Sequence, residues 1–328
     1  MAPTQRRQFL SRSIALVMLA ATRAQAQPRT YRIAYLAGST DAATAHLQKV
    51  LFGKLEELGY REGRNLVVER RFADGRLERL PALAAELVAL KPDIFFAAAS
   101  QATLAASKAT STIPIVFVAV SDPVGMGIVK SLGRPGTNAT GLSAQNVEIH
   151  SKRLQLVKEV FPSASRVAVL YNPLNAPSEP MLAMLKEASK TLGLVLRVIE
   201  AKSEQELASA FKTLESGRPD VLYVLESPFT FSHRMRIVEF TNSQHLPAVY
   251  GLTEFAEVGG LLTYSFNLLE HYRGAAAFID KILKGAKPSE LPVEQPTRFE
   301  LVLNLKTAKA LGVKFPPAIL VRADRVIE

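Results

Sequence analysis

Small polar residues recur directly after the apolar runs of this sequence, at the points where short buried strands are expected to end. In open parallel sheets ligands bind beyond the carboxyl ends of the strands, so these residues are the first candidates for chemistry. Hydroxyl groups and unpaired backbone N–H groups at helix N-termini can hold a carboxylate without a cation, and an acid such as Asp122 or Glu226 can face an ammonium group. The candidate ligand-binding residues are Ser39, Thr40, Ser100, Gln101, Ser121, Asp122, Asn172, Asn175, Glu226 and Tyr250.

Each Ser, Asn or Asp among these residues also has a simpler explanation, because these residue types are preferred at the N-caps of helices. That explanation suffices for any one of them taken alone. Six such segments, three in each half of the chain, favour a ligand cleft between two facing lobes.

Signatures of catalysis are absent from the sequence. It contains no G-x-x-x-x-G-K-[ST], no G-x-G-x-x-G after the first strand, no G-x-S-x-G and no H-E-x-x-H. Having no cysteine, the chain has no disulfide, no thiolate metal site and no thiol nucleophile. Asp122 and Glu226 could form a carboxylate pair for general acid–base catalysis, but the sequence gives no distance between them. We therefore expect a binding protein without a cofactor.

The histidines also argue against a metal site, because their spacing does not match that of metal ligands. His46 and His233 fall on expected helices, and we expect the histidines at surfaces or helix ends. They are His46, His150, His233, His245 and His271.

Length and composition are typical of a folded globular protein. A chain of 328 residues with 48% hydrophobic residues can fill two cores, which excludes a mostly disordered or fibrous protein. Lys and Arg number 40 against 30 Asp and Glu, and the excess is scattered, as at Arg61, Arg64, Arg70 and Arg71. Because basic tracts interleaved with aromatic residues are missing, we do not expect nucleic acid as a partner.

Residues 1–26 have the pattern of a cleavable export signal. Basic residues at Arg6-Arg7 precede an apolar run over 14–21, and Ala24-Gln25-Ala26 forms a small-residue cleavage site. The apolar run is shorter than the ~20 residues that cross a bilayer. We expect cleavage near Ala26 and a soluble periplasmic product. The paired arginines resemble a twin-arginine signal, with ordinary secretion as the alternative route.

Short apolar runs alternate with amphipathic stretches along the rest of the chain, which is typical of parallel strands joined by helices. The expected strands are Tyr31–Ala37, Asn65–Phe72, Asp93–Ala99, Ile115–Val120, Arg166–Tyr171, Val195–Glu200, Val221–Leu225 and Ala248–Tyr250. The expected helices lie near 43–58, 77–90, 101–110, 124–132, 178–192, 204–216 and 231–243.

The two halves share this alternation and also the Gly and Pro residues at which their helices end. Leu58-Gly59 and Leu192-Gly193 end the first helix of each half, where Gly can adopt the left-handed conformation. Lys91-Pro92-Asp93 matches Arg218-Pro219-Asp220, since in each case Pro stops a helix before a strand. The sequence thus predicts an α/β protein of two similar doubly wound, Rossmann-like lobes, with two unrelated α/β domains as the alternative.

Several motifs resemble the periplasmic substrate-binding proteins of ABC importers, in particular the subgroup with tryptophan- and tyrosine-type binding members. The resemblance covers essentially the whole chain after the signal. It is carried by Ser121-Asp122-Pro123-Val124-Gly125, the loop 134–141, Leu170-Tyr171-Asn172-Pro173, and the carboxy-terminal runs 259–285, 292–297 and 304–312. It implies a type I periplasmic-binding-protein fold with a ligand trapped between two lobes.

Two segments depart from the family pattern. Tyr264-Ser265-Phe266-Asn267 stands where relatives tend to have Tyr-Gly-Pro-Asn, and Glu226-Ser227-Pro228-Phe229 occupies a loop that usually differs. If these segments line the cleft, the ligand need not be that of the relatives. Phe229, Phe231 and Phe266 could form aromatic walls of the cleft, with buried core positions as the alternative.

The resemblance also suggests lobe boundaries and a mechanism. Lobe one is expected at 28–143 with a returning segment near 258–298, and lobe two at 144–257 with 299–328. Ser100, Gln101 and the amides near Ser121-Asp122 would hold a ligand carboxylate, while Asn172, Glu226 and Tyr250 approach from the other lobe. A hinge would close the lobes on the ligand.

The function expected from these features is a monomeric solute receptor. It would capture a small amino acid-like molecule, for which the resemblance suggests an aromatic amino acid, and deliver it to an ABC permease. The alternatives are an exported two-domain α/β enzyme and a ligand-sensing module for a membrane receptor.

Overall fold

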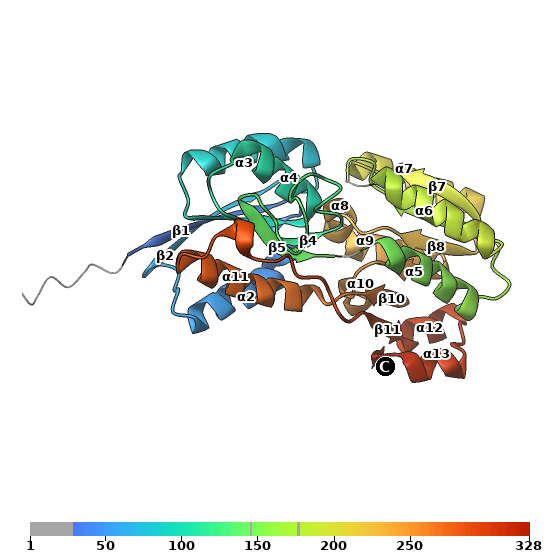
Figure 1. Ribbon diagram of the computed structural model, residues 1–328. Coiled ribbons are helices and arrows are strands. Elements are labelled where there is room, and N and C mark those ends of the chain that lie inside the picture. Colours follow the sequence, from blue (N-terminus) through green and yellow to red (C-terminus); the bar gives the residue numbers. More distant parts are fainter. Residues whose placement is uncertain (1–28, 145, 176–177) are drawn as a thin grey trace, which may run out of the picture.

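The computed structural model describes residues 29–144, 146–175 and 178–328, which fold into two α/β lobes lying side by side (Figure 1). The predicted export signal lies outside the described residues. Each lobe is built around one sheet with helices on both faces. The expected doubly wound α/β architecture is therefore confirmed.

The first lobe contains a five-stranded sheet in the order β2-β1-β3-β4-β5, all parallel. Helices α3 and α4 pack on one face, and α2 and α11 on the other. Burial on both faces explains why its central strands are continuous apolar runs. The elements are β1 Tyr31–Ala37, α2 Asp41–Glu57, β2 Leu66–Phe72, η1 Leu77–Arg79, α3 Leu80–Ala89, β3 Ile94–Ala98, α4 Ala99–Ala109, β4 Ile115–Val120, β5 Ala139–Ser143, α11 Leu268–Leu283 and η2 Pro288–Glu290.

The second lobe contains a seven-stranded sheet in the order β12-β11-β10-β9-β8-β6-β7, in which β11 runs antiparallel to β10. Helices α5, α6, α12 and α13 cover one face, while α7 and α9 cover the other. The elements are α5 Asn146–Val160, β6 Arg166–Tyr171, α6 Ser178–Thr191, β7 Val195–Glu200, α7 Glu204–Gly217, β8 Val221–Val224, α8 Pro228–Ser232, α9 Arg234–Ser243, β9 Ala248–Tyr250, α10 Glu254–Glu257, β10 Leu262–Ser265, β11 Glu300–Asn304, α12 Leu305–Leu311, α13 Pro317–Arg322 and β12 Arg325–Ile327.

The expected helix at 124–132 is wrong, because this segment forms a series of turns. The carbonyl of Pro123 accepts hydrogen bonds from both Ile128 and Val129, a wider spacing than the i to i+4 ladder of an α-helix. Gly127 adopts φ +69°, which breaks right-handed helical geometry. The segment therefore turns back before β5 and cannot extend as a helix.

The expected helix at 231–243 is divided into α8 and α9. A capping box between Ser227 and Thr230 starts α8 at Pro228, earlier than predicted. His233 lies between the two helices with φ −100° and ψ 14°. The cap places Glu226 and Ser227 just before a helix, in the loop that follows β8.

The lobe boundary in the carboxy-terminal third also needs correction. The returning segment was expected near residue 258, but β10 pairs with β9 in the second sheet. The chain therefore re-enters the first lobe only after Ser265, where α11 packs against α2. It crosses between the lobes after β5, between β10 and α11, and between η2 and β11.

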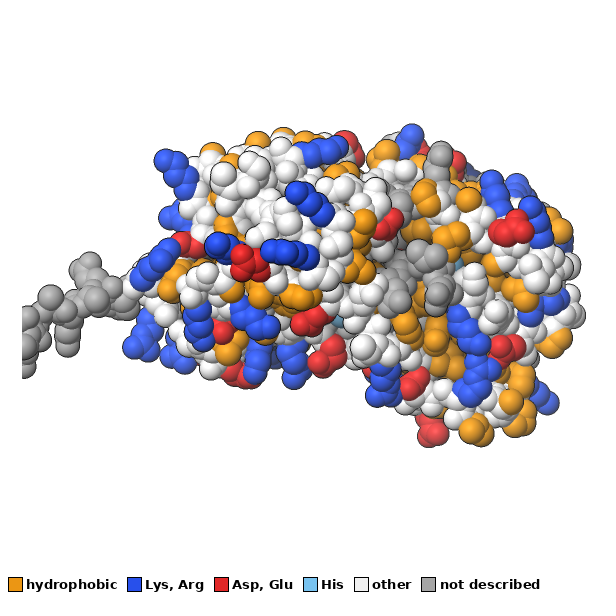
Figure 2. All heavy atoms as spheres, viewed as in Figure 1, with side chains coloured by type: hydrophobic (Ala, Val, Ile, Leu, Met, Phe, Trp, Pro, Cys, Tyr) orange, Lys and Arg blue, Asp and Glu red, His pale blue; other side chains and the backbone are white. Residues whose placement is uncertain are grey.

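One hydrophobic cluster runs continuously from the α2 and α11 face of the first sheet to the α7 and α9 face of the second. Phe229, Phe231, Leu252 and Phe266 belong to it, so the lobes meet through packed side chains. On the face shown in Figure 2, Lys and Arg side chains are spread over both lobes with Asp and Glu among them. Within the described ranges, every helix is too short or too polar to cross a membrane.

Candidate functional site

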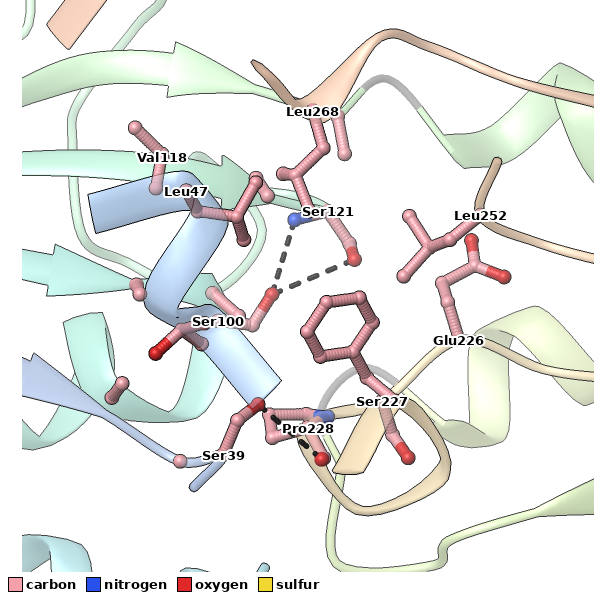
Figure 3. A pocket seen from close by; sticks show the side chains of 18 of the residues that line it. Ser39, Leu47, Ser100, Val118, Ser121, Glu226, Ser227, Pro228, Leu252 and Leu268 are labelled. Atoms are coloured by element: carbon pink, nitrogen blue, oxygen red, sulfur yellow. Dashed lines mark hydrogen bonds between the residues drawn. The ribbon is translucent and has the colours of Figure 1, made fainter. Parts of the chain in front are cut away.

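A cavity lies between the two lobes, at the carboxyl ends of β1, β3 and β4 in the first lobe and of β8 in the second (Figure 3). It encloses about 660 Å³ of space free of protein atoms, counting the part that opens to solvent. The cavity occupies the strand ends at which the sequence analysis placed the ligand.

Three serines form the polar side of the cavity in the first lobe: Ser39 after β1, Ser100 at the start of α4, and Ser121 after β4. Ser100 is buried, and its Oγ accepts a hydrogen bond from the Ser121 backbone N–H at 3.1 Å. The two hydroxyl oxygens lie 3.5 Å apart, and Figure 3 shows them on the same side of the cavity.

Two alanines with left-handed backbone conformations turn the chain into this arrangement. Ala99 has φ 67° and Ala119 has φ 55°, and both line the cavity. Such conformations cost an L-residue of order 1 kcal/mol and persist where the surrounding structure enforces them. Ala119 coincides with a register shift between Val118 and Val120 in the pairing of β4 with β5. The strain thus lies one residue before Ser100 and two residues before Ser121.

The N-terminus of α4 opens toward this polar side. Its N-cap residue, Ala98, has no side chain that can accept a hydrogen bond from the first turn. Helix N-termini carry unpaired N–H groups and a partial positive charge, so they favour anions. Together with the serine hydroxyls, this helix end can hold a carboxylate without a cationic side chain.

The second lobe contributes Glu226, Ser227 and Asn175 to the cavity. Asn175 donates a hydrogen bond to the Glu226 carbonyl at 3.2 Å, which fixes the loop after β6 against the loop after β8. Its Oδ1 is buried and has no hydrogen-bond partner among the described residues. Glu226 Oε1 is in the same situation. This side of the cavity therefore offers acceptors that lack donors.

A buried network lies behind Glu226. Arg153 of α5 is fully buried and donates to Glu226 Oε2 at 2.9 Å and to the Tyr223 hydroxyl at 3.1 Å. The Tyr223 hydroxyl also lies 2.6 Å from His150 Nδ1. Burial lowers the pKa of His150 to about 4 and raises the pKa of Tyr223 above its ordinary value. At neutral pH the network therefore holds one cation and one carboxylate.

Apolar side chains complete the cavity. Phe231 of α8 and Phe266, which precedes α11, both line it, so the predicted aromatic walls form at these two positions. Phe229 does not line it and packs against His233 with ring centroids 4.4 Å apart. The remaining large members are Leu47, Val118, Leu252, Leu268 and Tyr272.

The cavity brings together half of the residues proposed from the sequence. Those that line it are Ser39, Ser100, Ser121, Asn175 and Glu226. They come from five separate loops or helix starts, so the strand-end rule placed them correctly.

The other proposed residues do not line the cavity and have structural partners instead. Thr40 caps α2, and Asp122 accepts from the Gly125 backbone N–H at 2.8 Å. Gln101 donates to the Leu174 carbonyl in the other lobe, and Asn172 accepts from the Leu174 N–H at 2.9 Å. Tyr250 is fully buried, stacked on Phe255, with its hydroxyl 2.9 Å from that of Thr241.

Direct contacts join the lobes at the rim of the cavity. Ser39 Oγ donates to the Pro228 carbonyl at 3.3 Å, and the Thr40 N–H donates to Ser232 Oγ at 3.3 Å. Gly38 lies so close to Pro228 that an added Cβ would fall 2.9 Å from the proline ring. The lobes are therefore in contact around the cavity.

The sequence analysis missed Arg153, His150 and Tyr272. It expected histidines at surfaces or helix ends, but His150 and His271 are buried, with relative exposures of 0% and 5%. It also assigned no helix to 146–160, so Arg153 had no predicted place in the fold. Within the described residues, no group of three His, Asp or Glu side chains is arranged to hold a metal ion.

Comparisons with known proteins agree with this geometry. A family model described as ABC transporter substrate binding protein matches residues 39–327. A "Tyrosine-binding protein" from Clostridioides difficile (strain R20291) is 28% identical over 260 residues, which cover 79% of this chain and 74% of the relative. An ABC domain from Streptococcus pneumonia, solved in complex with L-Trp, is 26% identical with a TM-score of 0.82, covering 91% of this chain and all of the other.

A second solved structure bears on the arrangement of the lobes. The ligand-free, open structure of a substrate binding protein with adhesive properties from Clostridium difficile is also 26% identical, covering 91% of this chain and 99% of the other, but its TM-score is 0.62. Identity and coverage are nearly the same as for the L-Trp complex, so the difference lies in how the chains are arranged in space. The arrangement of this chain resembles that of the ligand-bound relative.

Proposed function

The chain belongs to the family of ABC transporter substrate-binding proteins, and from this premise we propose that it is a periplasmic receptor for an amino acid or a related small carboxylate. The ligand is held between the two lobes and passed to the membrane permease of an ABC importer. The receptor returns its ligand chemically unchanged.

The choice of ligand class rests on one observation: one side of the cavity wall has a carboxylate, and the opposite side has hydroxyl groups and a helix N-terminus. Among the described residues that line it, Glu226 is the only Asp, Glu, Lys, Arg or His. Its Oε1 is buried and lacks a donor, which leaves an acceptor for an ammonium group. The opposite side offers serine hydroxyls and the N-terminus of α4, which suit a carboxylate.

An α-amino acid matches both sides at once. Its carboxylate would lie near Ser39, Ser100 and Ser121, and its ammonium group near Glu226. Its side chain would pack against Phe231 and Phe266. The large apolar wall supports an aromatic or large aliphatic side chain, and the relatives named for tyrosine and bound to L-Trp make aromatic amino acids the first candidates.

The cellular role follows from the predicted signal. Export through residues 1–26, with cleavage near Ala26 and the Arg6-Arg7 pair directing the twin-arginine route, would place a monomeric receptor in the periplasm. Closing the lobes on a ligand creates the surface that a permease can distinguish from the open form.

Thermal unfolding tests the proposal. Residues 27–328 are unfolded and refolded to remove any bound ligand, then heated with the proteinogenic amino acids and with small organic acids. A ligand that binds only the folded state stabilises it by RT ln(1 + [L]/Kd). We expect a rise in midpoint confined to one class of α-amino acids, with the compound recovered unchanged. No rise with any compound, or conversion of the bound compound, would contradict the proposal.

A further inference from the structure

The two carboxylate oxygens of Glu226 have different surroundings. Oε2 accepts a hydrogen bond from Arg153 Nη1 at 2.9 Å, whereas Oε1 has no hydrogen-bond partner among the described residues. The side chain of Glu226 is only 11% exposed. A buried acceptor without a donor is costly, and a donor that arrives with the ligand would relieve this cost.

Arg153 is held rigidly behind this carboxylate. Its Nε donates to the Tyr264 carbonyl at 2.7 Å, and its Nη2 donates to the Gly251 carbonyl at 2.9 Å. Its Nη1 also donates to the Tyr223 hydroxyl at 3.1 Å. Because these bonds come from three separate strand ends or loops, the guanidinium has one orientation, and a single oxygen of Glu226 lies within its reach.

His150 completes the arrangement from the other side. An arginine only donates, so the Tyr223 hydroxyl accepts from Arg153 and gives its own proton to His150 Nδ1. The neutral His150 then carries its proton on Nε2, which lies 3.9 Å from Glu226 Oε1. That distance is too long for a hydrogen bond, and neither atom has a hydrogen-bond partner among the described residues, so Oε1 has room to accept one from a ligand.

The carboxylate of Glu226 occupies space that is free because Gly251 has no side chain. A Cβ added at Gly251 would lie 2.1 Å from Glu226 Oε2 and 3.1 Å from Arg153 Nη1. The end of the flexible Glu226 side chain would have to move away, while the backbone of Gly251, which does not have a positive φ, accepts alanine. The ion pair therefore depends on glycine at this position.

We propose that Arg153, which does not line the cavity, positions Glu226 to accept a ligand ammonium group and so sets a preference for amino acids over their desamino counterparts. The inference rests on the proposed function, because it concerns the same cavity. Arg153 contributes no direct ligand contact; it fixes which carboxylate oxygen faces the ligand.

Paired titrations test this role with the chain lacking only the predicted export signal. L-tyrosine and L-tryptophan are compared with 3-(4-hydroxyphenyl)propanoate and indole-3-propanoate, which keep the side chain and the carboxylate but lack the ammonium group. The variants are Gly251→Ala, Glu226→Gln, their combination, and Arg153→Met. Gly53→Ala is the matched control, since Gly53 is exposed on α2 and an added Cβ there meets nothing within 4 Å.

We expect Gly251→Ala and Glu226→Gln each to weaken binding of the amino acids by about ten- to a hundred-fold, the usual cost of losing a charged hydrogen bond. Binding of the desamino compounds should change by less than about threefold. The combined variant should be no weaker than Glu226→Gln alone within about threefold, because both changes act through one carboxylate. Arg153→Met, where it folds, should lose the same selectivity, and Gly53→Ala should behave as the wild type.

Three outcomes would overturn the inference. The first is that Gly251→Ala binds all four compounds as the wild type does. The second is that Gly251→Ala weakens amino and desamino compounds equally, as a general structural defect would. The third is that the effects of Gly251→Ala and Glu226→Gln multiply in the combined variant. A wild type that binds neither amino acid would contradict the choice of an aromatic amino acid as the ligand, which separates that failure from the other three.

Discussion

At the scale of single residues, the hydroxyl of Ser100 links the two strand ends that form the polar side of the cavity. It accepts from the Ser121 N–H and donates to the Ser121 Oγ at 3.5 Å, a long bond that a closer ligand oxygen would replace. Ser100 lies in the first turn of α4, where the helix dipole favours negative charge. This residue is therefore expected to contribute to ligand affinity more than to folding.

Replacing Ser100 by Ala should weaken ligand binding by about ten-fold, which corresponds to roughly 1.4 kcal/mol for one hydrogen bond in the cavity. The thermal midpoint without ligand should stay close to that of the wild type. Ser107→Ala on the same helix is the control, because the Ser107 hydroxyl donates to the Leu104 carbonyl within that helix and does not line the cavity. Isothermal titration calorimetry measures both affinities. Equal affinities for wild type and Ser100→Ala would remove Ser100 from the site.

At the scale of elements, α11 links the cavity to the core of the first lobe. Leu268 and Tyr272 line the cavity, and the Tyr272 hydroxyl lies 3.4 Å from that of Tyr35 in β1. Between them His271 is buried, with its ring stacked on Phe266 at 4.4 Å and no hydrogen bond to its Nδ1 among the described residues. Burial lowers the pKa of His271 to about 4.

The low pKa of His271 makes the stability of the protein depend on pH. The unfolded chain takes up a proton near pH 6.5, whereas folded His271 resists it down to about pH 4, so stability is lost as the pH falls through this window. We expect His271→Phe, which keeps the ring stacking, to remove a loss of up to about 3 kcal/mol between pH 6.5 and pH 4. Denaturant unfolding at several pH values measures it. Parallel pH profiles for variant and wild type would contradict this prediction.

At the scale of the whole molecule, ligand capture depends on the approach of the two lobes. Ser39 and Thr40 bond to α8 across the rim, and Gln101 bonds to the loop that follows β6. The chain crosses between the lobes three times, which restricts their relative motion to a hinge. Gly38 also lies at this rim, where an added Cβ would fall 2.9 Å from the Pro228 ring.

Gly38→Val should hold the lobes apart, because its side chain would overlap both Pro228 and Leu77. Overpacking typically costs about 1–3 kcal/mol, so ligand affinity should fall by about ten-fold or more. Small-angle scattering with ligand should show a larger radius of gyration than for the wild type. Gly133→Ala is the control, since an added Cβ at Gly133 meets nothing within 4 Å. Wild-type affinity and an unchanged radius would contradict the closure mechanism.

Local features of the fold could be predicted from the sequence, whereas contacts between residues far apart in the chain could not. The expected strands match those observed to within one residue at each end, because strands buried on both faces leave continuous apolar runs between turn residues. The serines of the cavity were predicted because each one follows such a strand. Arg153 could not be predicted in this way, because its pairing with Glu226 joins residues 73 positions apart and exists only in the folded chain.

Other errors have equally specific causes. Tyr250 follows the strand-end rule, yet β9 ends inside the core, so its ring packs on Phe255 away from the ligand. Asp122 also follows the rule, but its carboxylate closes the turn at Gly125. A residue at a strand end thus reaches the cavity only when no local turn or core contact takes its side chain.

A crystal structure of the refolded protein with the amino acid that stabilises it most tests the central claim most directly. The account predicts one ligand molecule between the lobes, with its carboxylate at Ser39, Ser100 and Ser121 and its ammonium group on Glu226 Oε1. A ligand bound outside this cavity, or bound in it with the two ends reversed, would contradict the account.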